Sequence, residues 1–171
     1  LLKDTGALFL TKVGHVALNG TDNIIISAVV GVLWVGRLSN YTLICDSVTS
    51  VLCQITAAIT GSLGNFFATE DKHAGYALFK KVEFLNFWLY GFSFIALVTL
   101  LDPFVQIWAG ERFVLGLPIS IAIAINFFVA GYMNTLWVFR STIGLFKQGK
   151  FRPILVAILN IILSIFLGKL W

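Results

Sequence analysis

Residues 12–27, KVGHVALNGTDNIIIS, place polar side chains inside a run of the chain that is long enough to cross a bilayer. Four of them follow the spacing i, i+3, i+7, i+10, which puts them on one face of an α-helix: Lys12, His15, Asn19 and Asp22. A charged side chain at bilayer depth is costly and is tolerated mainly toward a protein interior or a watery cavity. We therefore expect a membrane helix whose polar face lines a solvated pathway. The alternative is a buried, neutralised Lys12–Asp22 pair that holds helices together.

The composition indicates a membrane protein. Apolar residues make up 58% of the 171 residues and charged residues only 12%, whereas a soluble domain averages about half apolar and about a quarter charged. No basic patch with interleaved aromatic residues suggests nucleic-acid binding. The two cysteines, Cys45 and Cys53, fall on one predicted helix about 12 Å apart, which is too far for a disulfide.

The hydropathy pattern predicts an all-α, polytopic transmembrane helix bundle, since each span needs about 20 residues. About five spans are expected, at residues 5–30, 37–67, 82–101, 117–146 and 154–170. A turn around Gly31 and Gly36 should precede the second span, and a polar loop, residues 68–81, should precede the third. Asp102 and Pro103 should end the third span, because proline lacks an N–H and crowds the preceding turn.

Polar residues share one face on the other spans as well. Asn40 and Gln54 lie two heptads apart on the second span, and Asn126 and Asn134 share a face of the fourth. Helix packing and pathway lining both explain the second-span pattern, because small and polar residues also let helices approach closely in lipid. Arg140 either snorkels to the surface, which is the cheaper arrangement, or faces a cavity. The third span carries its own polar stripe, composed of Glu83, Asn86, Tyr90 and Ser93.

Several polar faces on neighbouring spans would enclose a hydrophilic cavity while their other faces meet lipid, as in a secondary transporter. The candidate pathway residues are Lys12, His15, Asn19, Asp22, Asn40, Gln54, Asn126, Asn134 and Arg140. A base such as Lys12 would attract an anionic head group, and an acid such as Asp22 would bind a proton or cation. No pair of catalytic carboxylates, metal-ligand cluster, phosphate loop or nucleophile elbow is recognisable, so we expect neither an enzyme nor a cofactor.

The basic residues predict the topology. If the N-terminal end is cytoplasmic, eight basic residues fall on the inner side, namely Lys3, Lys72, Lys80, Lys81, Arg140, Lys147, Lys150 and Arg152. Three fall on the outer side, namely Arg37, Arg112 and Lys169. Since loops rich in lysine and arginine stay in the cytoplasm, the positive-inside rule favours this orientation.

Two stretches carry a family resemblance. NGTDNIIISAVVGVLWVGRLSNYTLI, residues 19–44, combines a Thr-Asp pair, an aliphatic run, a Val-Gly pair and Ser-Asn-Tyr in a fixed order. It resembles the start of the C-terminal lobe of bacterial polysaccharide flippases of the Wzx type, which belong to the MOP exporter superfamily with the MATE exporters and the lipid II flippases. FVQIWAGERFVLG, residues 104–116, is similar to an outer loop of the same family. Arg37 and Leu38 depart from the pattern, which usually has an aliphatic residue and a tyrosine there.

The resemblance implies a larger two-lobe transporter of which this chain is a C-terminal lobe fragment without the N-terminal lobe. The cargo would be an undecaprenyl-pyrophosphate-linked glycan, moved across the bacterial cytoplasmic membrane by alternating access. Lys12, with Arg37 or Arg140, would attract the pyrophosphate.

By similarity to the lipid II flippases, Asp22 with Asn160 and Ser164 would form a site for a coupling ion, H⁺ or Na⁺. Ser164 stands where that family has an acid. Two alternatives stay open. One is cation-coupled multidrug efflux of the MATE type, against which Lys12 argues, and the other is a non-transporting membrane partner of a glycan assembly complex, with polar stripes that serve packing.

Overall fold

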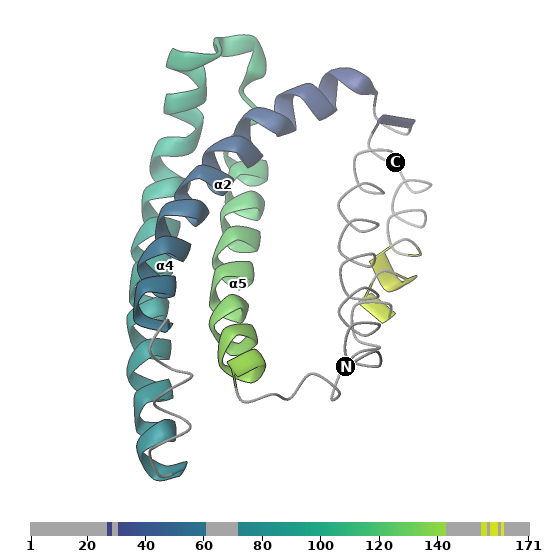
Figure 1. The fold of residues 1–171 in the computed structure, drawn as a ribbon. Helices are drawn as coiled ribbons and strands as arrows, with labels where there is room; N and C mark the ends of the chain where they lie inside the picture. The colour runs from purple at the N-terminus through teal and green to yellow at the C-terminus, as the bar shows by residue number, and fades with distance from the viewer. Residues whose placement is uncertain are drawn as a thin grey trace. The chain divides into compact units, whose positions relative to one another are not determined.

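The computed structural model describes residues 31–60 and 72–142, together with short helical pieces at residues 27–28, 155–156, 158–160 and 162. Regular structure in these residues is helical throughout, which confirms the predicted all-α class for them. The elements are α2 (Val32–Thr60), α4 (Lys72–Trp108), the 3-10 turn η1 (Glu111–Phe113) and α5 (Leu117–Thr142) (Figure 1).

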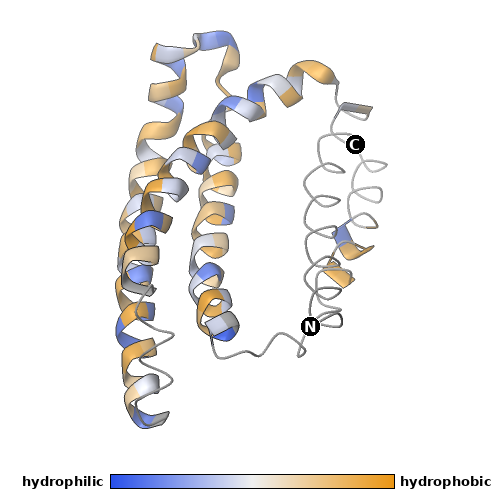
Figure 2. Cartoon of the chain, in the orientation of Figure 1, coloured by the Kyte–Doolittle hydropathy of each residue, from blue (hydrophilic) through white to orange (hydrophobic). Residues whose placement is uncertain are grey.

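Three helical segments are long and apolar enough to cross a membrane: Val32–Ala58, His73–Trp108 and Leu117–Arg140. Apolar residues run along most of their length (Figure 2), and large side chains such as Phe92 and Ile107 are 70% and 88% exposed. Exposed apolar surface of this extent is typical of helices that meet lipid. The chain is therefore membrane-embedded. The predicted first span lies almost entirely outside the described residues, and the fifth is described only in its short helical pieces, so the count of five stays a prediction.

Arg37–Gly144 form one compact unit, and Leu1–Gly36 with Leu145–Trp171 form another. Within the first of these, α4 packs along α5, and α2 joins them through a shared core. Aromatic rings supply much of that contact, with Tyr90 and Phe127 at a centroid distance of 5.2 Å and Phe94 and Phe128 at 5.9 Å. The core comprises Tyr41, Cys45, Leu52, Tyr90, Leu97, Leu101, Val105, Ala124 and Phe127.

The predicted turn around Gly31 and Gly36 is wrong in extent. Gly31 alone has a left-handed backbone, with φ of 112°, and its carbonyl accepts a hydrogen bond from the Trp34 amide at 3.1 Å. The helix begins at Val32 and continues through Gly36. One glycine thus completes the turn, and the second costs the helix only about 1 kcal/mol relative to alanine.

The third predicted span is too short at its N-terminal end. It was expected to start at residue 82 after a polar loop, but α4 begins at Lys72. Apolar contacts explain the extension, because the Phe79 ring meets Phe139 of α5 edge-on at 4.9 Å and Val82 is buried beside them. Packing against a neighbouring helix overrides the polar composition of residues 72–81.

The same span was also expected to stop at Asp102 and Pro103, and this expectation is wrong as well. α4 passes through Pro103 and ends at Trp108. Leu101 and Val105, on either side of the proline, are 1% and 0% exposed. Their burial holds the helix together across the missing N–H of Pro103.

Candidate functional site

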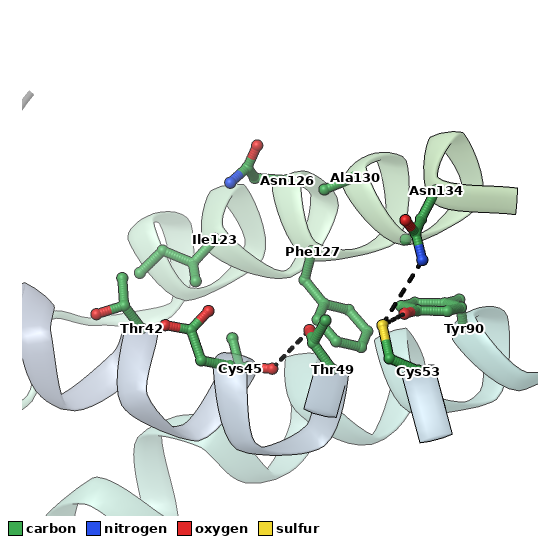
Figure 3. Close-up of a pocket in the computed structure, with 12 residues that line it drawn as sticks. Thr42, Cys45, Thr49, Cys53, Tyr90, Ile123, Asn126, Phe127, Ala130 and Asn134 are labelled. Atoms are coloured by element: carbon green, nitrogen blue, oxygen red, sulfur yellow. Dashed lines mark hydrogen bonds between the residues drawn. The ribbon is translucent and has the colours of Figure 1, made fainter. Parts of the chain in front are cut away.

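A pocket of about 320 Å³ lies between α2 and α5, with α4 behind it (Figure 3). Its lining combines hydroxyl, amide, thiol and carboxyl groups with a few apolar side chains. The residues are Thr42, Cys45, Asp46, Thr49, Cys53, Tyr90, Ile123, Asn126, Phe127, Ala130, Gly131 and Asn134. All of them belong to helices that can span a membrane, so the pocket puts polar groups at membrane depth.

The α2 wall consists of a polar stripe with spacing i, i+4, i+7, i+11: Thr42, Asp46, Thr49 and Cys53. At about 100° per residue these positions fall within about 60° of one another around the helix. The predicted stripe of this helix lies on another side, since Asn40 and Gln54 fall about 150° and about 110° from the centre of these four positions. Asn40 is half-buried, Gln54 is exposed, and neither lines the pocket.

On α5 the predicted common face of Asn126 and Asn134 does line the pocket. Asn134 reaches across to α2, where its Nδ2 donates to Cys53 Sγ at 3.6 Å. Asn126 is exposed at the rim (Figure 3). Arg140 is half-buried close to the C-terminal end of α5 and is not part of the lining.

The α4 wall is built around Tyr90. Its ring packs directly over Gly131 of α5, where any Cβ would overlap with ring carbons. Its hydroxyl lies 3.8 Å from Cys53 Sγ. One turn earlier, Asn86 Nδ2 donates to the Gly131 carbonyl at 3.1 Å. Tyr90 therefore closes the pocket floor and links all three helices.

Helix packing accounts for Asn86 and Glu83 of the polar stripe on α4. Asn86 is 3% exposed and points into α5. Glu83 accepts a 2.6 Å hydrogen bond from the Tyr132 hydroxyl of α5. Polar residues on α4 thus cross-link it to α5 and, except for Tyr90, do not line the pocket.

Asp46 is the one charged residue among the described residues that line the pocket. Its side chain is exposed to the pocket side of α2 and makes no hydrogen bond or ion pair within the described part of the chain. The pathway prediction for this span named Asn40 and Gln54 and did not include Asp46, the acid inside the same span. The available signal was the run of Thr42, Asp46 and Thr49 at helical spacing.

A second polar cluster joins the three helices toward the end where α4 meets α5. The hydroxyls of Tyr41 and Ser120 both donate to Asp102 Oδ1, each at 2.6 Å. The Tyr41 hydroxyl also accepts a 2.9 Å hydrogen bond from the Leu115 amide. Tyr41 and Ser120 are fully buried. This cluster was not predicted, because Asp102 was expected to lie where the third span ends.

The cation site expected by resemblance falls largely outside the described residues. Asp22 and Ser164 lie there, as do the predicted pathway residues Lys12, His15 and Asn19. Asn160 is helical and half-buried, and its Oδ1 has no hydrogen-bond partner in the described part of the chain. Asn160 belongs to the compact unit of Leu1–Gly36 with Leu145–Trp171, whereas the pocket belongs to the unit of Arg37–Gly144.

Comparison with known proteins adds no relative. No protein-family model, no curated protein and no solved structure matches the chain. The likeness to the polysaccharide flippases therefore rests on the motifs in residues 19–44 and 104–116 alone, and it remains a prediction from the sequence.

Proposed function

We propose that the protein is a transporter that moves a lipid-linked oligosaccharide or polysaccharide precursor across a membrane by alternating access. The observation that carries the proposal is the polar-lined pocket among α2, α4 and α5, all three of which are long and apolar enough to span the bilayer. Polar groups at this depth are expensive unless water, protein or a ligand meets them. A hydrophilic cargo in transit would do so.

The groups in the pocket suit sugar hydroxyls. Asn126 and Asn134 offer amide donors and acceptors from α5, and Thr42 and Thr49 offer hydroxyl oxygens from α2. The volume of about 320 Å³ is at the small end of small-molecule sites. This unit would therefore hold part of a glycan, with the remaining contacts supplied by other parts of the transporter. The motif resemblance adds undecaprenyl pyrophosphate as the carrier and the bacterial cytoplasmic membrane, with a cytoplasmic N-terminal end, as the location.

A flipping assay tests the proposal. The protein is reconstituted in vesicles with a fluorescent undecaprenyl-pyrophosphate-linked glycan, and the fraction protected from an impermeant quencher is followed with time. We expect faster flipping than in empty vesicles. Asn126→Ala with Asn134→Ala should slow it about thirtyfold, since two lost hydrogen bonds at roughly 1 kcal/mol each total about 2 kcal/mol. Gln54→Ala, an exposed amide outside the pocket, is the matched control. Flipping at the rate of empty vesicles would contradict the function.

A second candidate is cation-coupled multidrug efflux of the MATE type. The observation that favours it is Asp46, because an acid is the charged group that the described pocket presents. Accumulation of a cationic dye in cells with and without the protein separates the two. Dye exclusion without glycan flipping would favour efflux.

A further inference from the structure

We propose that Asp46 binds a monovalent cation in the pocket. The binding itself is argued from the geometry of α2, α4 and α5. Only its use, as the coupling ion of transport, rests on the proposed function.

The Asp46 carboxylate lies deep in the membrane-spanning part of α2. Asp46 lies at the midpoint of α2, whose 29 residues run from Val32 to Thr60. An ionised aspartate costs about 3 kcal/mol at the centre of a membrane helix, more than anywhere else along it. Such a position favours a partner with positive charge.

The described residues offer Asp46 no positively charged partner. Asp46 forms no hydrogen bond or ion pair with another described residue. The other described residues that line the pocket are neutral. Its other titratable members are Cys45 and Cys53 of α2 and Tyr90 of α4, and α5 contributes none. Among the described residues, therefore, no positive group faces the Asp46 carboxylate.

Two threonine hydroxyl oxygens beside Asp46 are available as ligands for a cation. Thr42 and Thr49 lie one turn before and one turn after Asp46 on the same face. Each hydroxyl proton is already used within the helix. Thr42 Oγ1 donates to the Ser39 carbonyl at 3.1 Å, and Thr49 Oγ1 donates to the Cys45 carbonyl at 2.8 Å, the bond drawn in Figure 3. The hydroxyl oxygens consequently have lone pairs left to face a cation.

The ligand is defined by a single positive charge that fits a pocket of about 320 Å³. A partly hydrated alkali ion meets this description, with carboxylate, hydroxyl and amide oxygens as ligands. A small quaternary ammonium also meets it, because the pocket lining includes aromatic rings as well as the carboxylate. The shared chemistry is a monovalent cation on the Asp46 carboxylate, and the arms of the test separate the two sources.

Cys53 gives a native reporter for this charge. It lines the pocket two turns from Asp46, and the other cysteine of the chain, Cys45, is buried and can be replaced by alanine. In that background, the rates at which Cys53 reacts with cationic and anionic methanethiosulfonates are compared. We expect the cationic reagent to be favoured, and the Asp46→Asn substitution to reduce the rate ratio on the order of tenfold for charges about 10 Å apart.

Two variants keep the result interpretable. Asp46→Glu retains the charge and should retain the preference for the cationic reagent. Glu111→Gln removes an exposed acid of η1, outside the pocket, and should change nothing. Each variant is first shown to elute as the wild type does in size-exclusion chromatography.

Cation binding is then read as protection. Sodium, potassium and tetramethylammonium chlorides are titrated at matched ionic strength, and labelling of Cys53 by the cationic reagent is followed. We expect saturable slowing in the protein with Asp46 and only the slowing due to charge screening in Asp46→Asn. A lower half-saturating concentration for an alkali ion or for tetramethylammonium identifies the source.

Three outcomes would overturn the inference. They are equal rates for both reagents, an unchanged ratio in Asp46→Asn, and no labelling by either reagent. The first two would mean that a base or a proton already neutralises the acid, and the third that the face is dry. Flipping is measured separately. If Asp46→Asn loses protection but flips the glycan at the wild-type rate, the site is retained and its coupling role is rejected. If the wild-type protein shows protection but no flipping, only the proposed cargo is rejected.

Discussion

The Tyr41 hydroxyl makes two hydrogen bonds that tie α2 to the other helices, donating to Asp102 and accepting from the Leu115 amide. We predict that Tyr41→Phe lowers the free energy of unfolding by about 1–3 kcal/mol, because a half-buried carboxylate and an amide each lose a partner. Thermal unfolding in detergent measures the loss, in a Cys53→Ala background where a thiol-reactive dye reaches buried Cys45 only on unfolding. Tyr76→Phe, on an exposed tyrosine of α4, should leave the melting temperature unchanged.

Gly131 permits the close approach of the Tyr90 ring. We predict that Gly131→Ala destabilises the protein by about 1–3 kcal/mol, since the added methyl must displace the ring at the pocket floor. Gly91→Ala is the matched control. Its methyl would meet only Phe128 Cε2 at 3.9 Å, an ordinary contact. If the two variants melted at the same temperature, the ring would not be confined as described.

At the residue scale, the sequence predicted side chains that share a face but not which face meets a neighbour. Asn126 and Asn134 were correctly grouped, because their own helix fixes their relation. Asp46 and Gln54 could not be ranked in this way. Both are polar residues on α2, and only the direction from which α5 approaches decides which of them lines the pocket. Tyr41 and Asp102 are 61 positions apart and lie on different helices, so no local pattern connects them.

At the scale of elements, Pro103 interrupts the hydrogen-bond ladder of α4 but does not end the helix. We predict that Pro103→Ala raises the melting temperature, because the restored N–H can bond to the preceding turn. Hydrogen exchange should slow in residues 99–108. Pro118→Ala serves as control. That proline sits in the first turn of α5, where a missing N–H costs little, so the change should be near zero. A lower melting temperature in Pro103→Ala would show that the helix needs the proline geometry.

Hydropathy alone was enough to identify the three described helices, and their boundaries failed for one shared reason. Local rules assign an end wherever the sequence becomes polar or meets proline. Residues 72–81 and Pro103 both satisfy such a rule, yet buried neighbours, Val82 in one case and Leu101 with Val105 in the other, keep the helix intact. α5 is described as far as Thr142, so the predicted end of this span at residue 146 lies outside the described residues.

At the scale of the whole molecule, the alternation of three spans places the η1 region and the start of α2 on one side of the membrane. The bond between Leu115 and Tyr41 supports this arrangement. With the N-terminal end inside, we predict that a cysteine at Glu111 reacts with an impermeant maleimide in intact cells. A cysteine at His73, near the start of α4, should react only after permeabilisation. The native cysteines are first replaced, and the reverse pattern would invert the predicted topology.

The length of α4 has a mechanical consequence. Its 37 residues make a rod of about 55 Å, whereas the hydrocarbon layer is about 30 Å thick. Even a steeply tilted rod of this length would stand partly in water, and its first turns, which include exposed Lys80 and Lys81, are suited to that position. Between these turns and Tyr90 the helix has no break, and Pro103 lies beyond both. The rod can therefore act as a lever, so that a push on its aqueous end moves the floor of the pocket.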